Sequence, residues 1–266
     1  MNSSFWKKTG RVWCSGLVLF GMRVIQNQTG FDPETGLALP SVAGAALVIG
    51  LVVLAALEVL FSLRLSKEKV DFEHHFAPPE KSLTALIIGC MMLVVGGILL
   101  AMEGVTAGGG IAAIVTGALA LLTGGGFLVL GRQMRAWDEL DVTPTLPSLF
   151  FGVFLVLAVY LPTASDPILE RYYLQVLAAA MVAYALGRLA GFLRKESSHR
   201  SFTPVGNLAV MTSIAAIADG GKALSLLFGG CAVVLSVFLA LQGGYIPSAE
   251  DEEAGETEEN EEAEAE

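Results

Sequence analysis

The sequence is poor in charged residues. Asp, Glu, Lys and Arg make up only 16% of its 266 residues, whereas about 25% is usual in a soluble globular domain. Apolar residues make up 54% of the chain, and the mean hydropathy is +0.64. A water-soluble fold of this length would need more polar residues to cover its surface. Because the apolar residues also occur in long runs, we predict an all-α polytopic transmembrane bundle embedded in a lipid bilayer.

The residues and motifs of enzymes and metal sites are also missing. Cys14, Cys90 and Cys231 are far apart in apolar runs, without a Cys-x-x-Cys or a Cys/His zinc spacing, and are expected to be buried. There is no Gly-x-Ser-x-Gly, no His-Glu-x-x-His and no Walker lysine. No basic patch interleaved with aromatic residues suits a nucleic acid. We therefore expect no enzyme activity, no cofactor and no nucleic-acid partner.

Basic residues are absent from the C-terminal segment. Eleven of the 26 acidic residues lie between Glu250 and Glu266. In the rest of the chain, 15 acidic residues balance 16 basic ones, so the net charge of −10 belongs to this segment. A segment with no apolar anchor beyond alanine cannot bury enough surface to fold. We predict a helical domain over residues 1–245 and a disordered acidic tail over residues 246–266, which is a solvated terminus or an electrostatic partner-binding segment.

Eight apolar stretches come close to the roughly 20 residues that a helix needs to cross a bilayer core. Two of them are marginal, because Arg23 shortens the first and polar residues such as Asn207 and Ser213 interrupt the seventh. No stretch between them is long enough for a separate folded domain. The predicted spans are residues 11–26, 42–63, 83–102, 111–130, 146–164, 172–193, 202–218 and 223–241.

Basic residues are distributed unevenly among the connecting segments. If the N-terminus is cytoplasmic, twelve Lys and Arg residues lie in cytoplasmic segments, and only Arg23, Arg171 and Lys222 lie on the opposite side. The positive-inside rule predicts this bias, and a wrong helix count would destroy the alternation. We therefore predict eight spans with both termini in the cytoplasm. Seven spans would put the basic N-terminus outside.

Glu58 and Arg188 are opposite charges inside predicted spans. Each lies six residues before the basic residue that ends its span, Arg64 or Arg194, and so roughly 9 Å inside the cytoplasmic boundary. Burying either charge alone in hydrocarbon costs about 2.5 to 3.5 kcal/mol, so each needs a partner or water. Three interpretations are open: both side chains snorkel to the boundary, they form a structural pair, or they serve transport or proton transfer.

Six further charged residues are expected at helix ends and in loops of the outer face. Charges are cheap there, so a solvated polar rim is the ordinary interpretation and a solute or ion site is the alternative. The alternating carboxylates of a calcium loop are absent. Within this set, the stretch "DPETG" predicts a turn in which the first aspartate accepts backbone N–H bonds. The six residues are Arg23, Asp32, Glu34, Glu103, Asp219 and Lys222.

The predicted cytoplasmic loop of residues 66–82 contains the adjacent histidines His74 and His75. Two imidazoles can bind a metal, but without a third ligand at a fixed spacing the signal is weak. A solvated loop without a metal is the alternative that we favour.

Small residues recur at four-residue spacing on two predicted spans, where they allow close helix packing. One stripe contains Ala179, Ala183, Gly187 and Gly191, and the other contains Gly109, Ala113, Gly117 and Gly125.

Three stretches of the chain carry a resemblance. The outer turn "GFDPETGL" and the runs "RYYLQVLAAAMVAYALGRLAGFLRK" and "NLAVMTSIAAIADGGKAL" resemble uncharacterised multi-pass integral membrane proteins of clostridial-type bacteria. The resemblance covers about a third of the chain. It implies a location in a bacterial plasma membrane, and it brings no activity and no catalytic residues.

Two function classes remain after these exclusions. The first is a carrier or permease-like component for a small solute or ion, favoured by Glu58, Arg188 and the polar residues of the seventh span. No broken helix or inverted repeat, which many carriers contain, is visible in the sequence. The second is a non-catalytic scaffold or sensor that acts through a protein partner, or through self-association, at the loop of residues 66–82 and the acidic tail.

Overall fold

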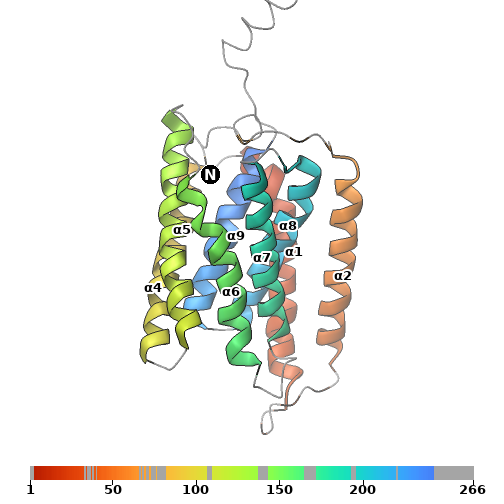
Figure 1. The fold of residues 1–266 in the computed structure, drawn as a ribbon. Helices are drawn as coiled ribbons and strands as arrows, with labels where there is room; N and C mark the ends of the chain where they lie inside the picture. The colour runs from red at the N-terminus through yellow and green to blue at the C-terminus, as the bar shows by residue number, and fades with distance from the viewer. Residues whose placement is uncertain are drawn as a thin grey trace, which may run out of the picture.

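A computed structural model describes residues 3–32, 34, 37, 39, 41–65, 67, 69, 72, 76, 82–106, 110–136, 143–164, 172–192, 196–219 and 221–242. This part of the chain is an all-α bundle of long helices (Figure 1), as the sequence predicts. The helices are α1 (Ser3–Thr29), α2 (Val42–Ser62), α4 (Leu83–Thr106), α5 (Gly110–Ala136), α6 (Pro147–Thr163), α7 (Tyr173–Gly191), α8 (His199–Ala216) and α9 (Lys222–Leu241), with the short 3-10 helices η1 (Thr143–Thr145) and η4 (Ile217–Asp219).

The length and composition of the helices are those of a multi-pass membrane protein. Seven of the helices in the described ranges are long and apolar enough to cross a membrane. The exception is α1, because its apolar stretch is bounded by charged residues. Helix α1 begins at Ser3, whereas the predicted span begins at residue 11. The prediction followed the apolar run, and lysines such as Lys7 and Lys8 interrupt an apolar run but are compatible with a helix. The acidic tail of residues 246–266 lies outside the described residues.

Helices α8 and α9 form the centre of the bundle, and α2 forms its edge. In the most apolar stretch of each helix, 67% of the residues of α8 and 72% of those of α9 are buried, but only 11% of those of α2 are. Helix α2 contacts α1 and α8 and stands apart from the other helices in Figure 1. Its surface carries exposed apolar side chains such as Val52, at 64% exposure. In a bilayer this surface faces lipid, which explains why it needs no protein cover.

Glycines bring the backbones of α4, α5 and α9 close together. A Cβ atom added to Gly97 on α4 would lie 2.7 Å from the carbonyl oxygen of Gly117 on α5, and one added to Gly230 on α9 would lie 2.9 Å from that of Gly89 on α4. Gly117 belongs to the second predicted stripe and packs as predicted. Gly125 of the same stripe has no atom of the surrounding structure within 4 Å of such a Cβ. Spacing alone therefore did not identify which members of the stripe pack.

In the first stripe the outcome is also divided. Ala183 on α7 packs against Gly152 on α6, whereas Gly187 is exposed and open. The cysteines divide in the same way: Cys90 and Cys231 are buried as expected, but Cys14 on α1 is exposed.

The connection between α2 and α4 crosses the end of the bundle where α8 begins and α9 ends. Lys69 pairs with Ser198 through a β-bridge, and Phe76 pairs with Gln242. Phe76 is 4% exposed, and its ring lies 5.2 to 6.2 Å from three others, those of Phe192, Phe202 and Phe238. Phe72 is buried beside it, with a ring distance of 4.7 Å. The prediction of a solvated loop is therefore wrong for these two phenylalanines, which anchor the connection by burying apolar area.

Candidate functional site

The Glu58 cluster, which consists of Arg11, Glu58 and Asn207, joins α1, α2 and α8. The side chain of Glu58 is only 5% exposed. Arg11 donates a hydrogen bond from Nη2 to Oε1 of Glu58 at 2.8 Å, and Asn207 donates from Nδ2 to Oε2 at 2.7 Å. Each carboxylate oxygen thus has a donor, and Arg11 compensates the charge. These contacts offset the cost of placing a carboxylate in an apolar helix.

Arg11 connects this buried carboxylate to the periphery of the bundle. Its side chain is 54% exposed, and its guanidinium lies 4.9 Å from the centre of the Phe61 ring of α2. An arginine in this position keeps its charged head near water or lipid headgroups while its stem covers apolar surface. The Glu58 cluster therefore extends from the interface of α2 and α8 to the surface.

Glu58 and Arg188 are not joined, so the structural pair, one of the three interpretations of their equal depth, is not formed. Arg188 on α7 donates to the hydroxyl of Tyr184, from Nε at 3.2 Å and from Nη2 at 2.8 Å. Tyr184 is 49% exposed, so this contact lies on the outer surface of α7, whereas Glu58 faces α1 and α8. Equal depth constrains only the height of a residue. The order of the helices around the bundle decides which charges meet.

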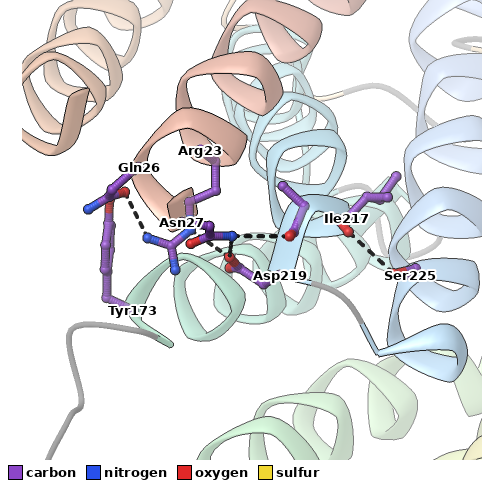
Figure 2. A network of polar contacts seen from close by, with 8 residues as sticks. Arg23, Gln26, Asn27, Tyr173, Ile217, Asp219 and Ser225 are labelled. Atoms are coloured by element: carbon purple, nitrogen blue, oxygen red, sulfur yellow. Dashed lines mark hydrogen bonds and ion pairs between the residues drawn. The ribbon is translucent and has the colours of Figure 1, made fainter. Parts of the chain in front are cut away.

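The Arg23 cluster lies at the other end of α1 and consists of Arg23, Gln26, Asn27, Tyr173 and Asp219 (Figure 2). Arg23 donates from Nε to Oδ1 of Asp219 at 2.5 Å and from Nη1 to Oε1 of Gln26 at 2.7 Å. Asn27 donates from Nδ2 to the same oxygen of Asp219 at 3.2 Å. The hydroxyl of Tyr173 donates to Oε1 of Gln26 at 3.4 Å. These bonds tie α1 to η4 and to the first turn of α7.

Arg23 and Asp219 form a buried ion pair. The side chain of Arg23 is 0% exposed and that of Asp219 is 4% exposed. The Arg23 guanidinium also lies 5.1 Å from the centre of the Tyr173 ring, within reach of a cation–π interaction. A solvated rim is therefore the wrong description for these two residues, because α1, η4 and α7 close around them.

The other residues of the predicted outer rim remain at the surface. Glu34, Glu103 and Lys222 are exposed. Asp32 accepts a hydrogen bond at Oδ1 from the backbone N–H of Glu34 at 3.0 Å, and its own N–H donates to the carbonyl of Leu37 at 2.9 Å. These two bonds form the turn predicted at this position. The rim thus separates into a buried pair and residues with no shared site.

His74 and His75 lie outside the described residues. Within the ranges that the structure describes, no group of three or more His, Cys, Asp or Glu side chains lies close enough to hold a metal ion.

The two clusters lie at two levels of the same helix interface. Arg11 and Asn207 both bind Glu58, and Arg23 binds Asp219. Arg11 and Arg23 are twelve residues apart on α1, as Asn207 and Asp219 are on α8 and η4, which separates the clusters by about 18 Å. Helix α1 and the segment formed by α8 and η4 both reach the Glu58 cluster first and the Arg23 cluster second, so α1 and α8 run parallel. In a bundle whose helices alternate in direction, two helices run parallel when their positions in the chain order are both odd or both even, and α1 and α8 are the first and the seventh long helices of the described chain.

A groove opens beside the Arg23 cluster, between α1, α2 and the first turn of α7. It has a volume of about 560 Å³, within the range of small-molecule pockets. Its polar lining comes from Gln26, Ser41 and Tyr173, and the rest is mainly apolar. Glu58 is not among its lining residues. The groove therefore reaches the Arg23 cluster but not the Glu58 cluster.

Sequence reasoning missed most partners of the two clusters. The sequence analysis treated Arg11 only as a cytoplasmic charge and Asn207 only as an interruption of a span. Nothing in the residue type or position of Gln26 and Tyr173 indicated a site. One feature of the sequence did point to these clusters: the two marginal spans, residues 11–26 and 202–218, are marginal because of their charged or polar residues. Such helices are stable in lipid when their polar groups meet each other, and α1 and α8 do pack together.

Comparisons with protein-family models, with curated proteins and with solved structures gave no match to this chain.

Proposed function

We propose that the protein is a carrier or permease-like component that moves a small solute or ion along the interface of α1 and α8. The observation that carries this proposal is the position of the buried charges. In the described part of the chain the buried charged side chains are Arg23, Glu58 and Asp219, and all three lie at this interface. Ionisable groups inside a membrane protein are costly and often mark a pathway for a substrate or a proton.

Uncharged polar groups lie between the two clusters. Trp13 on α1 donates from Nε1 to the hydroxyl of Ser236 on α9 at 3.0 Å. The hydroxyl of Ser213 on α8 is buried and has no hydrogen-bond partner among the described residues. Uncharged polar groups therefore occur between the levels of the two clusters, at the contact of α1 with α9 and on α8.

The proposed orientation places the chain across a bacterial plasma membrane eight times, with both termini in the cytoplasm. The parallel run of α1 and α8 supports eight spans. The excess of basic residues in the predicted cytoplasmic segments supports the absolute direction. The resemblance to clostridial-type membrane proteins supports the choice of membrane.

The test is solute flux in liposomes that contain the purified protein. Imposed gradients of H⁺, Na⁺ and K⁺, followed by a panel of sugars, amino acids and carboxylates, are measured as currents on a solid-supported membrane. We expect a current that falls at least tenfold in Glu58→Gln. Glu103→Gln, which changes an exposed carboxylate at the end of α4, is the matched control. If nothing in the panel moves and only deletion of the acidic tail gives a cellular phenotype, the carrier proposal is wrong.

A scaffold or sensor is the second candidate, and the buried connection between α2 and α4 favours it. Phe72 and Phe76 anchor this connection at the end of the bundle where α9 ends, and the predicted acidic tail follows α9 in the sequence. Neither candidate involves catalysis, a cofactor or a nucleic acid.

A further inference from the structure

The groove between α1 and α2 has a polar end and an apolar end. Gln26, Ser41 and Tyr173 lie at its polar end, which adjoins the beginning of α2, and Ala45 and Ile49 continue the lining along α2. From residue 41 to residue 49 the helix rises about 12 Å. The groove therefore changes from polar to apolar in the direction that leads from the membrane surface toward its centre.

The amide of Gln26 turns its N–H donors away from Arg23. Oε1 of Gln26 accepts from the Arg23 guanidinium at 2.7 Å, and a guanidinium can only donate, so the amide nitrogen must lie on the other side. Figure 2 shows this nitrogen pointing away from Arg23. It lies beside Gly44 of α2, 2.9 Å from where a Cβ would stand. Among the described residues it has no hydrogen-bond partner.

The groove carries no net charge. Its lining residues are uncharged, and the nearest buried charge, that of Arg23, is compensated by Asp219. A charged headgroup would lose its hydration at this site without gaining an opposite charge. An uncharged head with carbonyl or hydroxyl oxygens would accept hydrogen bonds from Gln26 at no such cost.

The groove borders a surface that faces lipid. Val48 and Ile49 line it and are 50% and 63% exposed, and they lie on α2, the helix with the smallest buried share. An occupant can therefore enter from the bilayer, with its chain beside these side chains and its head at Gln26.

We propose that this groove is a binding site for an uncharged membrane lipid of the diacylglycerol type, whose ester and hydroxyl oxygens accept hydrogen bonds from Gln26 and whose acyl chain lies along α2. The groove does not include Glu58, and binding of a lipid there can be measured directly, whether or not a solute moves. Its test therefore needs no transport activity.

The experiment uses the full-length protein in phosphatidylcholine nanodiscs and a diacylglycerol with a diazirine in one acyl chain. After illumination, we expect the label on peptides from residues 26–49. An excess of unlabelled diacylglycerol should reduce the labelling at least fivefold, and an equal excess of phosphatidylglycerol should not.

Two variants test the geometry. Gly44→Leu fills the groove and should lower the labelling at least fivefold, whereas Gly187→Leu, at an open position of α7, should leave it unchanged. Gln26→Glu keeps the oxygen that binds Arg23, removes the N–H donors and should lower the labelling even if Gly44→Leu does not fold. Equal labelling of Gln26→Glu and the unchanged protein, equal competition by phosphatidylglycerol, or label spread over all lipid-facing helices would each overturn the proposal.

Discussion

Arg23 is wholly buried, and its side chain contacts residues of α1, α7 and η4. Its Nε reaches Asp219, its Nη1 reaches Gln26, and its guanidinium lies against the ring of Tyr173. Arg11, at the other cluster, is half-exposed and reaches a carboxylate that is itself buried. In the Arg23–Asp219 pair both side chains lose their hydration, whereas in the Arg11–Glu58 pair mainly the carboxylate of Glu58 does. The two pairs should therefore respond differently to the loss of one partner.

We expect Asp219→Asn to destabilise the protein strongly. The substitution leaves the Arg23 guanidinium buried with an uncharged neighbour, and removing one partner of a buried pair costs about 3 to 5 kcal/mol. The measurement is the free energy of unfolding in mixed micelles with increasing denaturing detergent. Glu103→Gln, at an exposed carboxylate, should change it by less than about 0.5 kcal/mol. Equal stability of the two variants would show that the Arg23–Asp219 pair is not buried as described.

At the scale of the helix, close packing depends on which glycines face a neighbouring backbone. Gly117 on α5 lies against the backbone of Gly97 on α4, while Gly125, two turns further along α5, has open space beside it. Eight residues of an α-helix correspond to about 80° of rotation beyond two full turns. A stripe at four-residue spacing therefore drifts around the helix, and only part of it can face α4.

The two glycines form a matched pair for a stability measurement. Gly117→Leu should destabilise the protein by at least about 1 to 3 kcal/mol, because the new side chain meets backbone that cannot rotate away. Gly125→Leu should leave stability unchanged or raise it slightly, since leucine has the higher helix propensity. Both variants are compared by detergent-induced unfolding followed by circular dichroism. The reverse order of stabilities would contradict the packing of α4 on α5.

At the scale of the whole molecule, α1 completes the bundle although its composition is the least apolar. Its two arginines are compensated at two levels, by Glu58 from α2 and by Asp219 from η4. The stretch between them, Val12 to Met22, contains no charged residue and can pack in the bundle without compensation of a charge. Pairing with other helices thus allows a helix with two charges to lie in the bundle with the seven apolar ones, as the proposed eight-span topology requires.

Single cysteines at two exposed positions test that topology. In a variant without Cys14, Cys90 and Cys231, Lys67→Cys lies in the connection between α2 and α4, and Glu34→Cys lies between α1 and α2. With eight spans and cytoplasmic termini, a membrane-impermeant maleimide should label Glu34→Cys in intact cells and Lys67→Cys only after the membrane is opened. If only Lys67→Cys were labelled in intact cells, the orientation would be the reverse of the proposed one. If both variants were labelled, α2 would not cross the membrane.

The sequence by itself determined where the long helices lie, because the length of an apolar run is a local property that a bilayer selects. It also determined the turn at Asp32, where the hydrogen-bonding groups are within a few residues of each other. Only the tertiary structure decided that Glu58 meets Arg11 and Asn207 rather than Arg188, and that Arg23 is buried against Asp219. Depth in the membrane can be counted along the chain, but the rotation and the neighbours of each helix depend on how all the helices pack.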